Sequence, residues 1–371
     1  MLRFVDSFGH YTTDAALLTK WGIGSGGFTL QATGGRTGGP CANALGSSST
    51  SVGRLLSLGT GQTSWIMGAA LQGQQQTVLQ CNVYGSPFTS GNFPDGNNAG
   101  TLEWGMGGIT LVINSAGNMT VSAQGYYNNG VWQDRASVAS AAFEFQAAPL
   151  NPALWYYFEV KVVVNPSSNF QASVEVRVNG IVVYPLTSID VSGAGYGCVW
   201  PNLHTFAPVL SGCWAVCDFV VLDNTGANNT SYLGDVRVVA QLPAGDGFHQ
   251  DWAPLSGSSH FAQVDAASPP GDTDYNSTAT VGNMDSYVFP TPPTSSQVFG
   301  VQVNVWSRKS DAGAREVEAL ARLSGTDEVS PQMSLSTVYG DQMAIFEIDP
   351  SGAAWTSLSL ASAEFGVKLS T

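Results

Sequence analysis

Charged side chains are scarce in this chain of 371 residues, and basic ones are the scarcest. Asp, Glu, Lys and Arg make up 11% of the residues, with 13 Lys and Arg against 27 Asp and Glu, for a formal net charge of −14. The longest basic run is the pair Arg308-Lys309. Proteins that bind nucleic acid neutralise phosphates with clustered cations, so we do not expect nucleic acid as a partner.

Long apolar runs are also missing. No stretch approaches the roughly 18 apolar residues that a membrane-spanning helix needs, so we expect no membrane insertion. Residues 1–8 lack the apolar core and small-residue cleavage site of a signal peptide. We therefore expect synthesis in a cytoplasm. The acidic excess favours solubility at high local concentration.

Cysteine patterns give no metal site and no clear disulfide framework. No two cysteines are spaced Cys-x-x-Cys, and their number is odd. On one strand, Cys213 and Cys217 would lie roughly 13 Å apart, which is too far to bridge. We predict buried free thiols from a reducing compartment. The five cysteines are Cys41, Cys81, Cys198, Cys213 and Cys217.

Catalytic patterns are absent as well, and we predict that the chain is not an enzyme. The four histidines lie in no Gly-x-Ser-x-Gly setting. Glycoside hydrolysis needs two facing carboxylates, and the nearest pairs, Glu316/Glu318 and Glu347/Asp349, resemble solvent-facing strand residues. His249 and His260 flank Trp252, where ligand binding is conceivable, but a loop histidine bonded to the backbone is the favoured interpretation.

What the chain has in abundance is β pattern. Gly numbers 43, which is typical of short strands joined by tight turns. The strongest signal is at residues 155–184, where Phe158, Val160 and Val162 alternate with Glu159 and Lys161. The next strand alternates in the same way, and Asn179-Gly180 provides a type I′ turn between it and the following residues. We predict an antiparallel sheet with one polar face in water.

Further strands are predicted on both sides of a turn-rich break at residues 223–230. We expect an all-β chain with two domains, residues 1–230 and a smaller sandwich at residues 231–371. We expect residues 1–50 to be irregular. The pattern leaves room for one short helix elsewhere in the chain. The predicted strands are 64–71, 77–84, 108–113, 119–123, 142–146, 155–164, 172–178, 213–222, 236–242, 301–306, 316–323 and 365–369.

Two kinds of ligand site are conceivable. Exposed Trp and Tyr stack on sugar rings, whereas a sandwich also buries them in cores and interfaces, the favoured explanation at any one position. A calcium site is conceivable at Asp272, Asp274 and Asn276, because oxygen ligands on alternate residues can converge; capping of a Pro-Pro-Gly turn explains them equally well. The aromatic candidates are Tyr126, Tyr127, Trp132, Trp252 and Trp306.

The order of short motifs along nearly the whole chain resembles a class of tailed-bacteriophage virion proteins. Segments of the first half resemble their N-terminal segment and a concanavalin A-like, or laminin-G-like, jelly roll; Cys217 departs from that pattern by replacing an acid. The matching segments are Phe4–Phe8, Tyr11, Lys20-Trp21, Gly34–Arg36, Trp155–Val164, Val178–Gly180, Cys217–Asp223, Leu233–Arg237, Gly247–Trp252, Asp272–Asp274, Gly282–Tyr287, Arg308–Gly313, Asp349–Trp355 and Glu364–Gly366.

The resemblance implies a concanavalin A-like jelly-roll sandwich followed by a second, smaller antiparallel β-sandwich. It implies a virion structural protein, mounted on the tail or another appendage, with no catalytic residues to transfer. Other virion proteins would be its partners, a homo-oligomer is expected with a trimer favoured, and a host cell-surface glycan is a conceivable ligand. The alternatives are a capsid decoration or head-fibre protein, a polysaccharide depolymerase and a free sugar-binding lectin.

Overall fold

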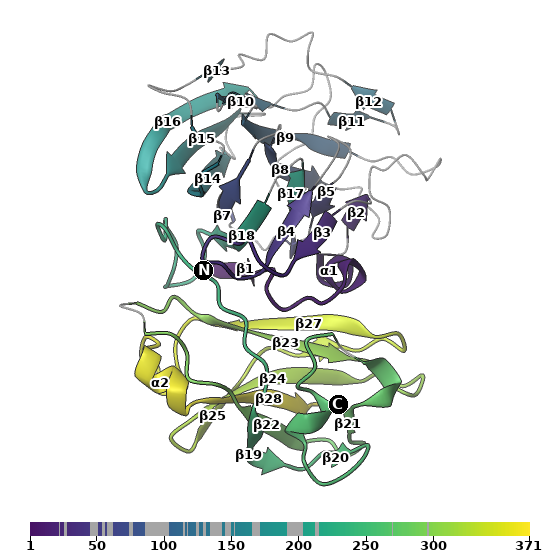
Figure 1. Ribbon diagram of the computed structural model, residues 1–371. Helices are drawn as coiled ribbons and strands as arrows, with labels where there is room; N and C mark the ends of the chain where they lie inside the picture. Colours follow the sequence, from purple (N-terminus) through teal and green to yellow (C-terminus); the bar gives the residue numbers. More distant parts are fainter. Residues whose placement is uncertain are drawn as a thin grey trace. The chain divides into compact units, whose positions relative to one another are not determined.

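The computed structural model divides into two compact units (Figure 1). Unit 1 comprises Met1 and residues 21–238, and unit 2 comprises residues 2–20 and 239–371. The predicted domain boundary after residue 230 stays a prediction. For several strands of unit 1 only the backbone is described. The structure describes all residues except 22, 26–27, 45–50, 54–55, 58–61, 74–76, 86–103, 114–115, 117, 124–125, 129–130, 134–142, 145–149, 152, 165–170, 191–202, 212–214, 269 and 295–296.

Two antiparallel sheets form the layers of unit 1 (Figure 1). The first sheet has the order β16 (Ile181–Asp190), β15 (Gln171–Val178), β14 (Tyr156–Val164), β7 (Ser64–Gln72), β18 (Ala215–Asp223), β4 (Cys41–Ala44) and β3 (Phe28–Gln31).

The second sheet has the order β12 (Val131–Gln133), β11 (Tyr126–Asn128), β9 (Trp104–Ile113), β8 (Thr77–Gly85), β17 (Leu203–Ser211), β5 (Ser51–Gly53) and β2 (Ile23–Ser25). Off this path lie β10 (Met119–Ala123), which pairs with β9 and β13 (Phe143–Glu144), and β6 (Leu56–Ser57), which pairs with β17.

The predicted hairpin is present, with the predicted turn. Asn179 and Gly180 have φ values of 50° and 78°, which the type I′ turn between β15 and β16 requires. In the register of β14 with β7, Val160 lies opposite Met67, and both side chains are buried in the core. The period-two alternation in the sequence therefore predicts correctly which side chains of β14 face the core.

Three sequence-based expectations are wrong. The outward face of β14 is covered, because Glu159 is only 1% exposed. Residues 236–242 form no strand. Residues 1–50 are not irregular: they contain β1 (Leu2–Asp6) and the helix α1 (Asp14–Trp21) in addition to short strands.

Unit 2 is a second antiparallel sandwich, as predicted. Its larger sheet has the order β19 (Gly245–Gln250), β22 (Met284–Val288), β28 (Glu364–Leu369), β24 (Glu316–Leu323) and β25 (Thr326–Val329), with β26 (Met333–Ser334) also paired to β24. Two smaller sheets pair β23 (Val301–Ser307) with β27 (Gly340–Phe346), and β20 (Ala253–Pro254) with β21 (Asn276–Ser277).

The core of unit 2 lies between the β23–β27 sheet and the larger sheet. Val301 and Val303 of β23 pack on a buried cluster that includes Ala319, Trp355 and Phe365. Because Val301, Val303 and Val305 use one face of β23, the alternate residues Gln302, Asn304 and Trp306 belong to the opposite face.

Helices are few and short in the described part of the chain. They are α1, α2 (Ser357–Ser362) and the 3₁₀ turns η3 (Phe261–Gln263) and η4 (Gly271–Thr273). None of the described helices has the length and apolarity to cross a bilayer.

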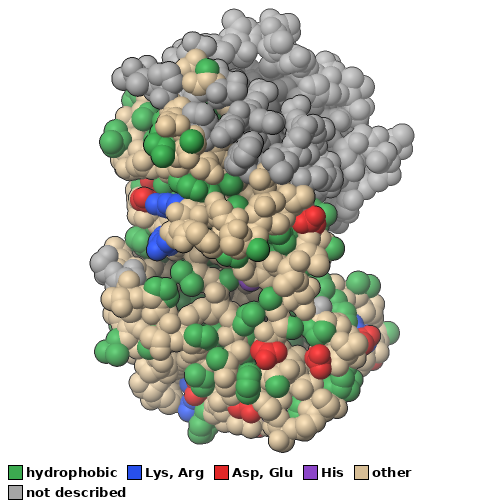
Figure 2. Space-filling view, in the orientation of Figure 1, with side chains coloured by type: hydrophobic (Ala, Val, Ile, Leu, Met, Phe, Trp, Pro, Cys, Tyr) green, Lys and Arg blue, Asp and Glu red, His purple; other side chains and the backbone are tan. Residues whose placement is uncertain are grey.

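Figure 2 shows charged side chains scattered among hydrophobic and uncharged polar ones on the face that it draws.

A close approach of two strands in unit 2 gives the first testable prediction. Gly366 is buried in β28 opposite Ser286, and a Cβ there would overlap the Asp285 carbonyl oxygen. We expect Gly366→Ala to destabilise unit 2 by at least about 2 kcal/mol, because backbone rather than a flexible side chain must move. Denaturant unfolding measures the loss.

Gly340→Ala is the matched control on another strand of unit 2. Its added Cβ would meet only the Gln342 amide nitrogen, at 3.7 Å, which is an ordinary contact. Equal stability of the two variants would contradict the close packing of β22 on β28.

Candidate functional site

The polar side chains of the first sheet in unit 1 hold a segment that would otherwise lack backbone partners. We call residues 232–238 the latch segment. The Leu233 and Gly234 amides both donate to Glu159 Oε1, at 3.0 Å each. The Tyr232 ring lies under the Arg177 guanidinium, 3.7 Å from its centroid. A glutamate predicted to face water is therefore a buried double acceptor.

The other end of the latch segment is held by a β-bulge. Asp218 has a φ of 55°, and the pairing of β18 with β7 shifts register between Cys217 and Val220. Asp218 Oδ1 accepts the Val238 amide at 2.9 Å, and its Oδ2 lies 3.6 Å from Arg36 Nη1. Asp218 thereby joins the sheet, Arg36 and the end of the segment.

Arg36 connects the latch segment to the remaining charges. It donates to the Asp235 carboxylate and to the Val236 carbonyl, and lies over the Tyr157 ring at 5.6 Å from the centroid. The motifs Gly34–Arg36 and Leu233–Arg237 are far apart in sequence, and this contact joins them. Both carry the resemblance noted in the sequence.

Burial controls the protonation of this cluster. It raises the pKa of Glu159 despite the two amide bonds that lower it, and it raises the pKa of Asp218 despite the Val238 amide and Arg36. It also raises the pKa of the neighbouring Cys217 thiol to about 12. A thiol in that state is a poor nucleophile. Cys41 and Cys217 are buried and free, as predicted, whereas Cys198, Cys213 and the side chain of Cys81 lie outside the described part of the chain.

In unit 2, the N-terminal motif forms a second buried charge cluster. Asp6 accepts the Phe8 amide at 2.7 Å and the Tyr11 hydroxyl, and it lies 3.3 Å from Lys20 Nζ. Burial would raise the pKa of Asp6, but Lys20, His10 and these bonds together lower it. Burial in turn lowers the pKa of His10 to about 4. The cluster ties the segment before α1 to the helix.

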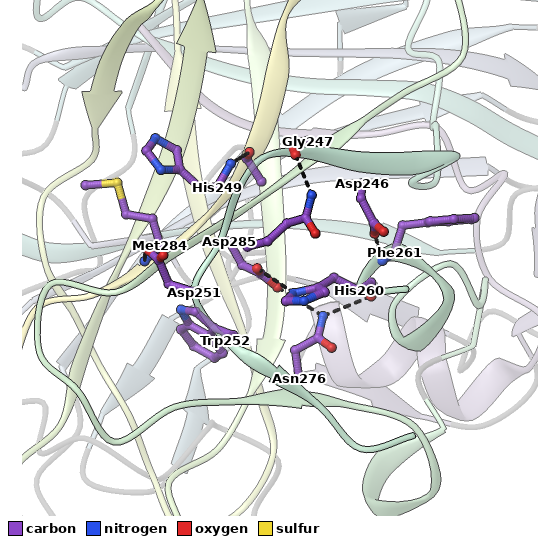
Figure 3. Close-up of polar contacts among 12 residues, drawn as sticks. Asp246, Gly247, His249, Asp251, Trp252, His260, Phe261, Asn276, Met284 and Asp285 are labelled. Carbon is purple, nitrogen blue, oxygen red and sulfur yellow. Dashed lines mark hydrogen bonds and ion pairs between the residues drawn. The ribbon is translucent and has the colours of Figure 1, made fainter. Parts of the chain in front are cut away.

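Unit 2 also contains a buried histidine–carboxylate network (Figure 3). His260 Nδ1 lies 2.8 Å from Asp285 Oδ1, and Asp285 Oδ2 accepts the Tyr287 hydroxyl at 2.7 Å. The Asn276 amide donates to Asp285, to Tyr287 and to the His260 carbonyl, at 2.9–3.1 Å. Burial raises the pKa of Asp285, although the Tyr287 and His260 bonds oppose it.

Both histidines beside Trp252 pair with carboxylates rather than with backbone. His249 Nε2 lies 2.9 Å from Asp327, whereas His260 faces Asp285. A histidine oriented by a buried Asp is half of a hydrolytic triad, which also needs a nucleophile bonded to the other ring nitrogen. Among the described contacts, no hydroxyl or thiol bonds His260. The observed bonds instead tie the loops that contain His260 and Asn276 to β22.

The aromatic candidates divide into three cases. Tyr126, Tyr127 and Trp132 are on β11 and β12, where Tyr127 is opposite Trp132; their side chains lie outside the described residues. Trp252 packs on the cluster of Val317, Val367 and Leu369 and donates to the Asn283 carbonyl at 3.2 Å. Trp306 stacks on the Tyr339 ring, with centroids 5.9 Å apart and planes 4° apart.

The calcium candidates take part in different interactions. Asp272 Oδ1 accepts Arg308 Nη2 and the Tyr339 hydroxyl, both at 2.8 Å, and those bonds lower its pKa. Asn276 belongs to the His260 network, and Asp274 is exposed. Within the described part of the chain, no three His, Cys, Asp or Glu side chains cluster as metal ligands would. The calcium site stays a prediction without support from this geometry.

Comparison with known proteins gives weak likenesses only. No family model matches the chain, and no curated protein matches its sequence. A variant of the alginate lyase Aly36B in complex with alginate trisaccharide is 13% identical, with a TM-score of 0.31 over 59% of this chain and 97% of its own.

Two further solved structures show the same level of likeness. A marine alginate lyase from Aplysia kurodai is 9% identical, with a TM-score of 0.31 over 60% of this chain and 99% of its own. The CBM2 module of the evolved Dit of Lactobacillus casei BL23 phage J-1 is 10% identical, with a TM-score of 0.32 over 61% and 97%. Similarities this weak carry no argument about what the chain binds or does.

The latch segment gives a pH-dependent prediction. Because the folded-state pKa of Glu159 is raised, its stabilising contribution is complete below the ordinary carboxyl pKa and is lost as the pH rises through the raised value. Glu159→Gln retains an acceptor oxygen but has no charge to bury. Its stability relative to the native chain should therefore rise as the pH is raised above the ordinary carboxyl pKa, measured by denaturant unfolding.

Glu159→Ala separates the hydrogen bonds from the charge. It leaves the Leu233 and Gly234 amides without their acceptor and should cost about 1–3 kcal/mol at acidic pH, where the Glu159 side chain is protonated in the native chain. If Glu159→Gln lost stability relative to the native chain as the pH rises, the proposed origin of the raised pKa would be wrong.

Proposed function

We propose that the chain is a non-catalytic structural component of a tailed-bacteriophage virion. The sequence resemblance supports the class of particle, and the all-β architecture of both units agrees with what that resemblance implies. Unit 1 would serve as a binding or adhesion module, and unit 2 as a docking and assembly module on the tail or another appendage. Other virion proteins would be its partners.

One observation carries the proposal: motifs behind the resemblance make internal ties. Asp6 of the N-terminal motif bonds Lys20. Arg36 bonds Asp235 of the Leu233–Arg237 motif. Asp272 bonds Arg308 of a third motif. Side chains that hold segments together support a scaffolding role, in which the chain supplies a shape rather than a reactive group.

Asp349 also has a structural role, because its side chain stabilises the turn that follows it. Its Oδ1 accepts the Ser351 amide at 2.9 Å, the Ala353 amide at 3.1 Å and the Ser351 hydroxyl at 2.5 Å. These bonds lower the pKa of Asp349. A sequence that pairs Glu347 with Asp349 thus uses the aspartate for a turn.

Self-association as a trimer belongs to the same proposal. Strand β16 is one end of the first sheet of unit 1, and the end strand of a sheet can pair with another chain. Symmetric assembly is one way to cover such ends, and a particle-mounted oligomer gains avidity from weak individual contacts. Copies made in the bacterial cytoplasm would enter the particle during assembly.

Imaging of intact particles tests the proposal. Purified virions, labelled with an antibody against the full chain and examined by electron microscopy, should show the label on the tail or an appendage. Label spread over the icosahedral shell would replace the tail assignment with capsid decoration. Particles without the chain would overturn the virion role.

The non-catalytic part has its own measurement. The purified chain, incubated with host capsule or lipopolysaccharide, should release no reducing ends and no unsaturated sugar products. Release of either would assign a depolymerase, with the His260–Asp285 pair as the first site to mutate.

A further inference from the structure

A partly exposed pair of parallel aromatic rings lies at one end of the β23–β27 sheet of unit 2. Trp306 pairs with Asp341 across the sheet, and Tyr339 comes just before β27. Tyr339 and Asp341 have the same parity, so the stacked Trp306 and Tyr339 rings form a diagonal pair on one face of the sheet. That face is opposite to the one that packs on the core.

An ion pair borders the rings. Asp272 Oδ1 accepts Arg308 Nε at 3.2 Å, Arg308 Nη2 at 2.8 Å and the Tyr339 hydroxyl at 2.8 Å. The Arg308 guanidinium lies 5.1 Å from the Tyr339 ring centroid. Since the Asp272 and Arg308 side chains are 65% and 34% exposed, the pair is open to solvent.

The remaining polar groups of Asp272 and Arg308 can form hydrogen bonds with the hydroxyl groups of a ligand. The bonds that Asp272 makes to other described residues use Oδ1, so Oδ2 can accept from a ligand. A guanidinium has five N–H donors, of which Asp272 takes those of Nε and one at Nη2. An acceptor and a donor a few ångströms apart match two neighbouring hydroxyls, one donating to Asp272 and one accepting from Arg308.

The aromatic pair supplies the other half of sugar recognition. The face of an aromatic ring is the negative end of its quadrupole, and it attracts the weakly positive C–H bonds on the face of a pyranose. The neighbouring charges of Asp272 and Arg308 cancel, so nothing here favours an anionic ligand. We propose that Trp306, Tyr339, Asp272 and Arg308 form a binding site for a neutral saccharide.

The Phe248 site in unit 2 provides an internal comparison. The Arg322 guanidinium lies 4.0 Å from the Phe248 ring centroid, and Arg322 pairs with Asp327, so an aromatic ring again meets an Arg–Asp pair. His249, however, occupies Asp327 Oδ2, and the His249 ring meets Phe248 edge-on at 87°. This site lacks both the parallel ring pair and the open carboxylate oxygen, and we expect no sugar there.

The test uses the full chain and neutral oligosaccharides. An array of gluco-, galacto-, manno- and N-acetylglucosamine oligomers should show binding, and calorimetry with the best oligomer should give its Kd. Trp306→Ala should raise that Kd at least about tenfold. Asp272→Asn and Arg308→Gln should each weaken binding with little effect on the unfolding transition, because an exposed ion pair contributes little to stability.

Phe248→Ala is the matched control, because it removes an exposed ring beside an Arg–Asp pair, and it should leave the Kd within about twofold of the native value. The inference is overturned if no neutral oligomer binds, if only acidic glycans bind, or if Trp306→Ala and Asp272→Asn bind as the native chain does. It goes beyond the virion role: label on the tail with no glycan binding would refute the saccharide site and leave the virion role intact.

Discussion

A buried carboxylate that accepts backbone amides is the interaction on which the irregular parts of this chain depend. Strands satisfy their own N–H groups in ladders, whereas segments that cross the outside of a sheet have no ladder. Glu159 accepts two amides of the latch segment, and Asp218 accepts one at its far end. In unit 2, Asp6 accepts the Phe8 amide. Each carboxylate replaces a missing strand partner.

The electrostatic consequence depends on what else faces the carboxylate. Asp6 has Lys20 and a tyrosine hydroxyl beside it, so its pKa falls, whereas Glu159 and Asp218 lie under the latch segment with less compensation, so their pKa values rise. Deprotonation of Glu159 and Asp218 therefore destabilises unit 1, whereas deprotonation of Asp6 stabilises the Asp6 cluster. Acidic pH should tighten the latch segment while it weakens the Asp6–Lys20 pair.

Sequence reasoning predicted the strands with the clearest alternation well, because alternation is local, and it missed others such as β17, β22 and β27. The β14–β15–β16 meander needed only period two and Asn179-Gly180. It failed where a distant segment decides the environment: Glu159 looks solvent-facing until residues more than 70 positions later cover it. The alternation at residues 236–242 suggested a strand, yet the Val238 amide goes to Asp218. Of the candidate aromatics, Trp306 gained a partner, Tyr339, that no spacing in the sequence indicated.

The few Lys and Arg side chains of this chain are mostly found in ion pairs with its own carboxylates. At least seven of the 13 Lys and Arg side chains pair with carboxylates in the described part of the chain: Lys20, Arg36, Arg177, Arg308, Arg315, Arg322 and Lys368. More than half of the basic side chains thus form ion pairs within the chain, whose net charge is −14. Long-range attraction of an anionic partner is weak under these conditions. Recognition must then rely on short-range contacts, namely hydrogen bonds and aromatic faces, which are the groups that the Trp306 site presents.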